Sequence, residues 1–238
     1  MHEPCAAQPV LGLPMVYLVD DEPAVRDGLQ WLLRSRRLLC ECFGDAAGFQ
    51  AMLGEALAQD AEWPRAPACL LLDIRMPGTS GLALFESLAQ RALCAALPVI
   101  FLTGHGDVPT AVAAIKRGAF DFVEKPFSNN ALVDRVEQAL RSSASVLGVR
   151  QRVGGLRRRL AELTERERQV LELVARGEAN KQIARRLEIS VRTVEVHRSR
   201  VFDKMGVRSA AELANRLREL QPGAGEPWAA TAPRPAHT

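Results

Sequence analysis

Two apolar runs in this sequence are followed at once by aspartates. The run 69–72 ends on Asp73, after which Met76-Pro77-Gly78 excludes further strand, and an earlier run ends before Asp20 and Asp21. Four apolar residues in a row predict a strand buried on both faces, and side chains that follow parallel strands meet at one edge of the sheet. We therefore expect the three carboxylates to lie close together. Because they would repel each other without a cation among them, they predict a Mg²⁺ site completed by waters.

A hydroxyl and an ammonium follow two later apolar runs. Residues 99–102 end before Thr103, and residues 122–124 end before Lys125, which precedes Pro126. At the same sheet edge, Lys125 would offer an anion a point charge and Thr103 a hydrogen bond. Asp73 could then attack a phosphoryl group, because the metal ion and Lys125 neutralise the developing charge. A single aspartate after a strand is more often a helix cap, and only the convergence of these polar residues favours phosphoryl chemistry.

The elements that must position these residues alternate along the first part of the chain. Continuous apolar runs predict strands, and apolar residues at helical spacing predict helices. Strands are expected at residues 15–19, 38–43, 69–73, 98–103 and 121–124, and helices at 22–36, 45–58, 80–92, 107–117 and from 128 onward. This alternation predicts an α/β fold with a doubly wound five-stranded parallel sheet.

The second part of the chain is basic and reads as helical. Residues 1–142 carry 12 Lys and Arg against 17 Asp and Glu, whereas residues 143–238 carry 19 against 11. A basic half is expected of a nucleic-acid partner, although surface charge is often only solvation. Thr164 and Glu167 form a capping-box pattern, and Asn180 is expected to cap a short helix. That helix and the next, joined by Glu188-Ile189-Ser190, predict a helix-turn-helix within a smaller all-α four-helix domain.

The helix after this turn is the expected recognition helix. Together with the helix before it, it is expected to supply the DNA contacts: Lys181, Arg192, Thr193, Glu195, Val196, Arg198, Ser199 and Arg200. Arg198 and Arg200 can bind phosphate, and Arg192 can read a guanine edge. Glu195 can accept a hydrogen bond from cytosine or only orient an arginine. His197 is expected to pack half-buried, because no Cys or acidic cluster surrounds it.

The first part of the chain resembles the receiver domain of two-component response regulators, on five residues in the expected order: Asp20, Asp21, Asp73, Thr103 and Lys125. The stretch LTGHGDVPTAVAAIKRGAFDFVEKPF, residues 102–127, is similar to the FixJ-type subgroup in nearly every position. The resemblance implies a flavodoxin-like fold with Asp73 as phospho-acceptor. It implies a Mg²⁺ site formed by Asp20, Asp21, Asp73 and the backbone carbonyl of Arg75. It also implies that Thr103 and Phe122 are a switch pair, and that Lys125, with a cis bond to Pro126, binds the phosphate.

The stretch LTERERQVLELVARGEANKQIARRLEISVRTVEVHRSRVFDKMGV, which begins at Leu163, closely resembles the LuxR-type DNA-binding module. The expected organisation is a disordered extension (1–14), a receiver domain (15–142), a helical linker (143–162), the DNA-binding domain (163–220) and a disordered tail (221–238). Apolar residues in the linker follow a heptad spacing: Val146, Val149, Val153, Leu156, Leu160 and Leu163. Gly154-Gly155 interrupts this seam and predicts a hinge. A signalling or dimer helix and a linker that only packs on a neighbouring domain remain equally open.

Apolar stretches and cysteines bear on where in the cell the protein is expected. No apolar stretch reaches the roughly 18 residues of a membrane span, and no signal-peptide pattern opens the chain. The five cysteines are odd in number, and Cys40 and Cys42 share one face of an expected strand as small buried hydrophobes. A cytoplasmic protein without a membrane partner is expected.

The resemblance implies a response regulator that a sensor histidine kinase phosphorylates on Asp73. Phosphorylation would promote a homodimer that binds two half-sites of double-stranded DNA and acts on RNA polymerase, as an activator. Enzymatic activity would be limited to Mg²⁺-dependent phosphoryl uptake and self-dephosphorylation. Arg75 and His105, two residues beyond Asp73 and Thr103, would tune that hydrolysis.

Two alternatives remain open. The first is a DNA-binding regulator whose receiver is a phosphate-independent docking module. The second, less favoured, is an Asp-nucleophile phosphohydrolase, because such enzymes use a second acid two residues after the nucleophile and Arg75 stands there.

Overall fold

The computed structural model describes residues 12–104 and 108–220. These residues form two compact units, of which the first ends at Val149 and the second begins at Arg150. The division falls inside the expected linker. Almost all of the expected N-terminal extension, the expected tail, and His105 lie outside the described residues.

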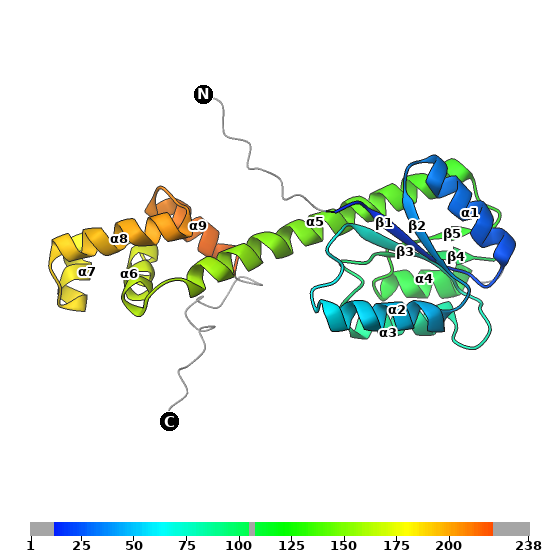
Figure 1. Ribbon diagram of the computed structural model, residues 1–238, viewed down its shortest axis with the longest axis horizontal. Helices are drawn as coiled ribbons and strands as arrows, with labels where there is room; N and C mark the ends of the chain where they lie inside the picture. Colours follow the sequence, from blue (N-terminus) through cyan, green and yellow to red (C-terminus); the bar gives the residue numbers. More distant parts are fainter. Residues whose placement is uncertain (1–11, 105–107, 221–238) are drawn as a thin grey trace. The chain divides into compact units, whose positions relative to one another are not determined.

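The first unit contains one parallel sheet (Figure 1). Its strands follow the order β2-β1-β3-β4-β5, and their bounds are β1 Met15–Val19, β2 Leu39–Phe43, β3 Ala68–Asp73, β4 Val99–Thr103 and β5 Asp121–Glu124. Every neighbouring pair is parallel. The chain reverses direction across the sheet between β2 and β3, so β1 and β3 are the central strands of a doubly wound fold. The predicted α/β class and strand positions are confirmed.

Helices cover both faces of this sheet. Their bounds are α1 Pro23–Ser35, α2 Ala46–Gln59, α3 Gly81–Gln90, α4 Val108–Lys116 and α5 Asn129–Ala161. In Figure 1, α1 and the first turns of α5 lie on one face, and α2, α3 and α4 lie on the other. Parallel strands need such crossover helices, and covering both faces removes the apolar sheet from water.

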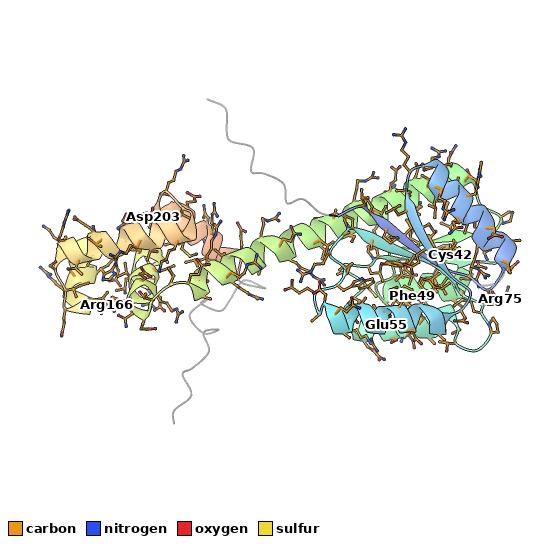
Figure 2. All side chains as sticks on the ribbon, viewed as in Figure 1. Cys42, Phe49, Glu55, Arg75, Arg166 and Asp203 are labelled. Atoms are coloured by element: carbon orange, nitrogen blue, oxygen red, sulfur yellow. The ribbon has the colours of Figure 1, made fainter. Side chains whose placement is uncertain are left out.

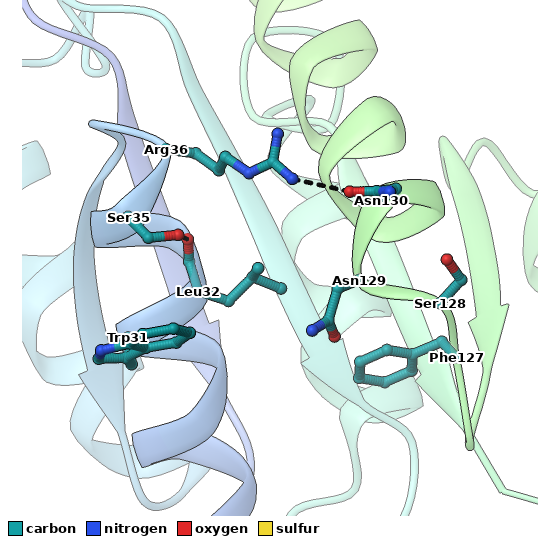
Figure 3. A pocket seen from close by; sticks show the side chains of 8 residues that line it. All are labelled: Trp31, Leu32, Ser35, Arg36, Phe127, Ser128, Asn129 and Asn130. Carbon is teal, nitrogen blue, oxygen red and sulfur yellow. Dashed lines mark hydrogen bonds between the residues drawn. The ribbon is translucent and has the colours of Figure 1, made fainter.

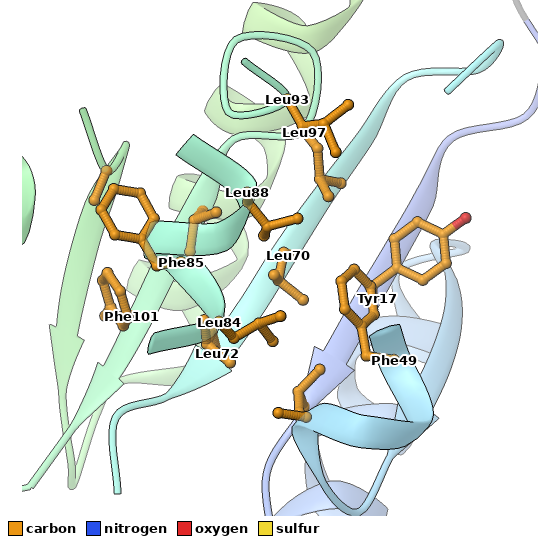
Figure 4. Packing of buried hydrophobic residues seen from close by; sticks show 14 of the residues in the cluster. Tyr17, Phe49, Leu70, Leu72, Leu84, Phe85, Leu88, Leu93, Leu97 and Phe101 are labelled. Atoms are coloured by element: carbon orange, nitrogen blue, oxygen red, sulfur yellow. The ribbon is translucent and has the colours of Figure 1, made fainter. Parts of the chain in front are cut away.

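The two faces have separate hydrophobic cores because successive strand residues point to opposite sides. The side chains on the α2–α4 side include Tyr17, Leu70, Leu72 and Phe101, which pack with Phe49, Leu84 and Phe85 (Figure 4). Those on the α1–α5 side include Val16, Leu18, Leu71, Ile100 and Leu102. All six residues of β3 are buried, as the continuous apolar run predicts.

Three cysteines belong to the α1–α5 side. Cys69 is fully buried there, whereas Cys40 and Cys42 are half-buried, with their sulfur atoms 3.7 Å apart. The expected burial of Cys40 and Cys42 is therefore found only in part.

The second unit consists of the end of α5 and four helices with one shared core. The helices are α6 Glu165–Ala175, α7 Asn180–Leu187, α8 Val191–Met205 and α9 Ala210–Arg218. Thr164 and Glu167 make both hydrogen bonds of the predicted capping box. Glu188 ends α7 in the left-handed conformation, with φ 54°, and so forms the predicted turn before α8. The helix-turn-helix arrangement is confirmed.

One local expectation is corrected. Ala179, not Asn180, is the N-cap of α7. The backbone N–H of Ala179 donates a hydrogen bond to the side chain of Gln182. The Asn180 carboxamide instead accepts a hydrogen bond from Arg198. The expected linker is helical, and both Gly154 and Gly155 lie inside α5. Leu147 and Leu156 are buried on either side of the pair, and packing of this kind outweighs the poor helix propensity of glycine.

Candidate functional site

The carboxylates of Asp73 and Asp20 meet the ammonium of Lys125 at the edge where the strands end. Lys125 Nζ lies 2.7 Å from Asp73 Oδ1 and 2.8 Å from Asp20 Oδ2. The backbone N–H of Arg75 donates to Asp73 Oδ2 at 2.7 Å, and that of Glu22 donates to Asp20 Oδ1 at 2.9 Å. Each carboxylate oxygen therefore accepts one hydrogen bond, and the two buried aspartates share a single cation.

Burial sets the electrostatics of this group. It raises the pKa of the Asp73 carboxyl above its ordinary value, and the hydrogen bond from Lys125 only partly offsets the effect. Burial alone would lower the pKa of Lys125, but its hydrogen bonds to Asp20 and Asp73 outweigh burial and raise it. Lys125 is therefore a permanent cation at neutral pH.

The expected cluster of three carboxylates forms only in part. Asp21 is half-buried, and no three His, Cys, Asp or Glu side chains in residues 12–104 and 108–220 gather into a ready metal site. Mg²⁺ typically binds one or two carboxylates together with waters and phosphate oxygens rather than a complete protein cage. The oxygen donors of Asp20 and Asp73 fit that requirement.

Thr103 and Phe122, the expected switch pair, occupy different environments. Thr103 is fully buried at the end of β4, and its hydroxyl has no hydrogen-bond partner among the described residues. A buried hydroxyl without a partner costs free energy, which makes it a ready donor for an incoming anion. Phe122 on β5 is half-buried and packs against the core on the α2–α4 side. The Lys125–Pro126 bond is cis, as the resemblance implies.

Two further side chains border the acidic group. Figure 2 shows Arg75 at the edge of the sheet where the strands end, and its side chain is exposed. Arg26 of α1 donates from Nη1 to the backbone oxygen of Asp20 at 2.6 Å. Sequence reasoning missed Arg26. The available signal was its position in the turn of helix directly after the acidic pair.

An open groove of about 610 Å³ begins two residues beyond Lys125 (Figure 3). It lies between the C-terminal half of α1 and residues 127–130, and Arg36, which follows α1, donates a hydrogen bond to Asn130 at 2.7 Å. Trp31, on its α1 side, is 72% exposed. Sequence reasoning did not single out Trp31, although a tryptophan on the polar side of an amphipathic helix was a usable signal.

The expected DNA contacts divide into an outward set and an inward set. The outward set is exposed and consists of Lys181, Arg192, Glu195, Val196, Ser199 and Arg200. Arg192 and Glu195 pair at 3.6 Å, and Val196 is 41% exposed. Thr193 and Arg198 are half-buried and have partners within the unit. The Thr193 hydroxyl lies 2.8 Å from that of Ser190.

Arg198 does more to hold the unit together than its expected role suggests. It donates to Asn180 at 2.8 Å and lies over the Phe202 ring at 5.2 Å. Its guanidinium therefore joins α7 to α8. His197 is half-buried, as expected, and its Nδ1 has no partner among the described residues.

The sheet order, the acidic edge and the helix-turn-helix unit together define a response regulator with a DNA-binding module. Residues 16–137 match the family model of the response regulator receiver domain, and residues 161–217 match that of bacterial regulatory proteins of the luxR family. The chain belongs to the two-component response regulators of the FixJ-like type. A receiver implies a sensor kinase as partner, and a LuxR-type module implies DNA binding.

Known relatives cover most of the chain. The C4-dicarboxylate transport transcriptional regulatory protein DctR of Rhodobacter capsulatus is 47% identical over 84% of this chain and 96% of its own length. Transcriptional regulatory protein FixJ of Azorhizobium caulinodans is 44% identical over 83% of this chain and 89% of its own. The solved structure of response regulator StyR has a TM-score of 0.74 and 40% identity, covering 87% of this chain and all of that one. Among the helices in the described ranges, none is both long and apolar enough to cross a membrane.

Proposed function

We propose that a sensor histidine kinase phosphorylates this regulator on Asp73, and that phosphorylation controls its binding to DNA. A carboxylate oxygen of Asp73 attacks the phosphorus atom of the donor. One P–O bond forms, the bond to the leaving group breaks, and the product is an acyl phosphate. The observation that carries the proposal is the geometry of Lys125, whose ammonium lies 2.7 Å from Asp73 Oδ1.

Each residue of the edge has a part in this step. Burial of Asp73 excludes bulk water from the nucleophile, and Lys125 neutralises charge on the phosphoryl oxygens. The unpartnered Thr103 hydroxyl donates to one of those oxygens. Asp20, Asp21, Asp73 and the carbonyl of Arg75 would hold Mg²⁺, which supplies further neutralisation of the transferred group.

Phosphorylation adds about −1.5 to −2 charges beside Thr103 and Lys125. If Thr103 turns toward the phosphoryl oxygens, the half-buried Phe122 can occupy the space it leaves. That rearrangement alters the surface formed by α4 and β5, where we place the contact of a homodimer. The dimer would present two α8 helices to two half-sites and act on RNA polymerase as an activator.

The outward set on the second unit supports the DNA-binding part. Arg200 and Lys181 are exposed cations suited to phosphates, and Arg192 and Glu195 offer base-edge contacts. The exposed Val196 suits the methyl group of thymine. Thr193 and Arg198 are each bonded within the unit and help to hold α8, and Arg198 keeps further N–H donors for a phosphate contact.

Treatment with acetyl phosphate and Mg²⁺ tests the proposal, with intact-protein mass spectrometry to count phosphoryl groups. We expect the wild type to gain one and Asp73→Asn to gain none. Asp27→Asn is the matched control, because Asp27 is an exposed aspartate on α1. Equal uptake by wild type and Asp73→Asn would contradict the assignment. No uptake by any form would favour a phosphate-independent docking module.

A further inference from the structure

The last turns of α5 contact the C-terminal end of α8 within the second unit. Arg159 donates from Nη1 to the backbone oxygen of Met205 at 3.0 Å. Met205 is the last residue of α8, and Gly206 follows it in the left-handed conformation, with φ 61°. The free carbonyls at a helix C-terminus carry partial negative charge, so a guanidinium placed there is stabilising. Arg159 therefore caps the expected recognition helix from outside.

Gly206 leaves the room that this contact needs. A Cβ atom at this position would lie 2.8 Å from Nη1 of Arg159, closer than a real side chain permits. The guanidinium and the cap glycine are thus fitted to each other. Any side chain at position 206 would have to displace Arg159 or distort the end of α8.

A second contact holds the same end of α8. Lys204 donates from Nζ to the backbone oxygen of Glu162 at 3.0 Å and to Glu167 Oε2 at 2.7 Å. Leu156, one turn before Arg159, is buried in the core that also contains Val201. Residues 156–162 are therefore part of the framework on which α8 rests.

The held end of α8 is opposite the end that carries the base-reading members of the outward set. The first turns of α8 contain Arg192, Glu195 and Val196, and its last turn ends at Met205. A helix of 15 residues is about 22 Å long, so a tilt of ~5° at one end displaces the other by about 2 Å. Hydrogen bonds to base edges do not survive a displacement of that size.

We propose that Arg159 is a positioning residue for sequence-specific DNA recognition: it fixes the C-terminal end of α8 and thereby the placement of the base-reading side chains. The inference rests on the proposed DNA binding. It differs from a phosphate-contact role for Arg159, because a lost phosphate contact weakens binding to every sequence alike. A lost positioning contact weakens the selected sequence more than an arbitrary one.

The test uses the full chain and measures fluorescence anisotropy with two duplexes. One is a duplex that the acetyl-phosphate-treated wild type selects from a randomised library, and the other is a scrambled duplex of equal length. For Arg159→Ala, we expect the ratio of selected to scrambled affinity to fall roughly tenfold. The slope of log K against log salt for the scrambled duplex should not change. Arg159→Lys, which keeps a cationic donor, should recover part of the ratio.

Arg158→Ala is the matched control. Arg158 is the adjacent exposed arginine, and its side chain makes no hydrogen bond or ion pair with any described residue. Arg158→Ala should leave the ratio of selected to scrambled affinity unchanged. Thermal unfolding curves of each variant are used to choose an assay temperature at which the proteins are folded. If Arg159→Ala is unfolded at every usable temperature, the comparison is made with Arg159→Lys instead. An unchanged ratio in Arg159→Ala, or equal losses on both duplexes, would overturn the positioning role while leaving DNA binding intact. Failure of the wild type to select any duplex would overturn both proposals.

Discussion

Asp73 ends β3 and Lys125 follows β5, two strands separated by β4, yet Lys125 Nζ lies 2.7 Å from Asp73 Oδ1. The lysine side chain therefore reaches across the end of β4, where Thr103 is buried with its hydroxyl unpaired among the described residues. Three neighbouring strands thus deliver a nucleophile, a hydroxyl and a cation to one point. A phosphoryl group on Asp73 would lie within reach of both other side chains.

Removal of Lys125 should separate phosphorylation from its consequence. In Lys125→Ala, Asp73 keeps its nucleophilic oxygen, so some phosphoryl uptake from acetyl phosphate is expected. Dimerisation, measured by analytical ultracentrifugation, should no longer follow. Asp20 and Asp73 would also face each other without their shared cation, so Mg²⁺ should raise the melting temperature of this variant by several degrees more than that of the wild type. Equal effects of Mg²⁺ on both proteins would contradict the shared-cation interpretation.

The lifetime of the acyl phosphate should depend on the side chains beyond the acidic group. The backbone N–H of Arg75 is bonded to Asp73 Oδ2, so we expect the exposed Arg75 side chain to lie near a phosphoryl group on Asp73. A water must approach in line for hydrolysis, and bulky side chains obstruct it. Replacing Arg75 and His105 together with Ala should change the dephosphorylation rate several-fold without preventing uptake. Loss of the phosphoryl group is followed by mass spectrometry. Arg141→Ala, which removes an exposed arginine of α5, is the control. An unchanged half-life would show that these side chains point elsewhere.

Stability of the second unit should fall in acid because of Glu167. This carboxylate is 3% exposed, and the hydrogen bonds from Lys204 and from the Thr164 backbone lower its pKa from 4.5 to about 2. A lowered folded-state pKa stabilises the fold above the unfolded value, so the contribution is present above pH 4.5 and is lost as the pH falls toward 2. Glu167→Gln should lower the free energy of unfolding by about 1 to 2 kcal/mol at neutral pH, allowing for the partly exposed lysine, and by little near pH 2. Urea unfolding at several pH values measures this. Glu165→Gln, which removes an exposed neighbour, should show no such dependence.

The sequence predicted the features that depend on residues close together in the chain, such as buried strands and helix caps. The apolar run before Asp73 indicates a buried strand, and the C-terminal ends of parallel strands meet at one edge of a sheet. Together these two rules predict that Asp73, Thr103 and Lys125 lie at the same edge. The capping box of Thr164 and Glu167 followed from spacing alone.

The features that the sequence did not predict depend on hydrogen bonds between residues far apart in the chain. Asn180 is a good cap residue, but its carboxamide is taken by Arg198, 18 residues later in the chain. The bond from Arg159 to Met205 joins residues 46 positions apart and depends on how two helices cross. Neither of these outcomes has a signal at the scale of a motif.

The glycine pair in α5 offers a direct test of the expected hinge. A Cβ at Gly154 or Gly155 would meet nothing within 4 Å, so alanine fits both positions. Each replacement should stabilise the helix by about 0.5–1 kcal/mol, because glycine loses more backbone freedom on folding. If the pair is a hinge, Gly154→Ala with Gly155→Ala should also reduce the gain in DNA affinity that acetyl phosphate produces. Gly54→Ala in α2 is the matched control, since its Cβ also meets nothing. A full gain in the double variant would remove the hinge from the mechanism.

The last prediction concerns how the two units act on each other. The first 142 residues carry a net charge of −5 and the remainder +8, so the acidic receiver could restrain the basic module. We expect a fragment of residues 150–220 to bind a single half-site more tightly than the unphosphorylated full chain. The second unit begins at Arg150 and has its own core, including Leu156, so this fragment keeps its framework. Circular dichroism checks that it is folded.

Salt dependence separates this masking from dimerisation. Each neutralised phosphate contributes about −0.9 to the slope of log K against log salt. Dimerisation on a two-half-site duplex should raise the slope of the phosphorylated full chain toward twice that of the fragment. Relief of masking should instead raise the affinity for one half-site, because more of the module's cations become available. We expect both effects on phosphorylation. A fragment that binds one half-site no better than the unphosphorylated full chain would exclude masking and leave dimerisation as the switch.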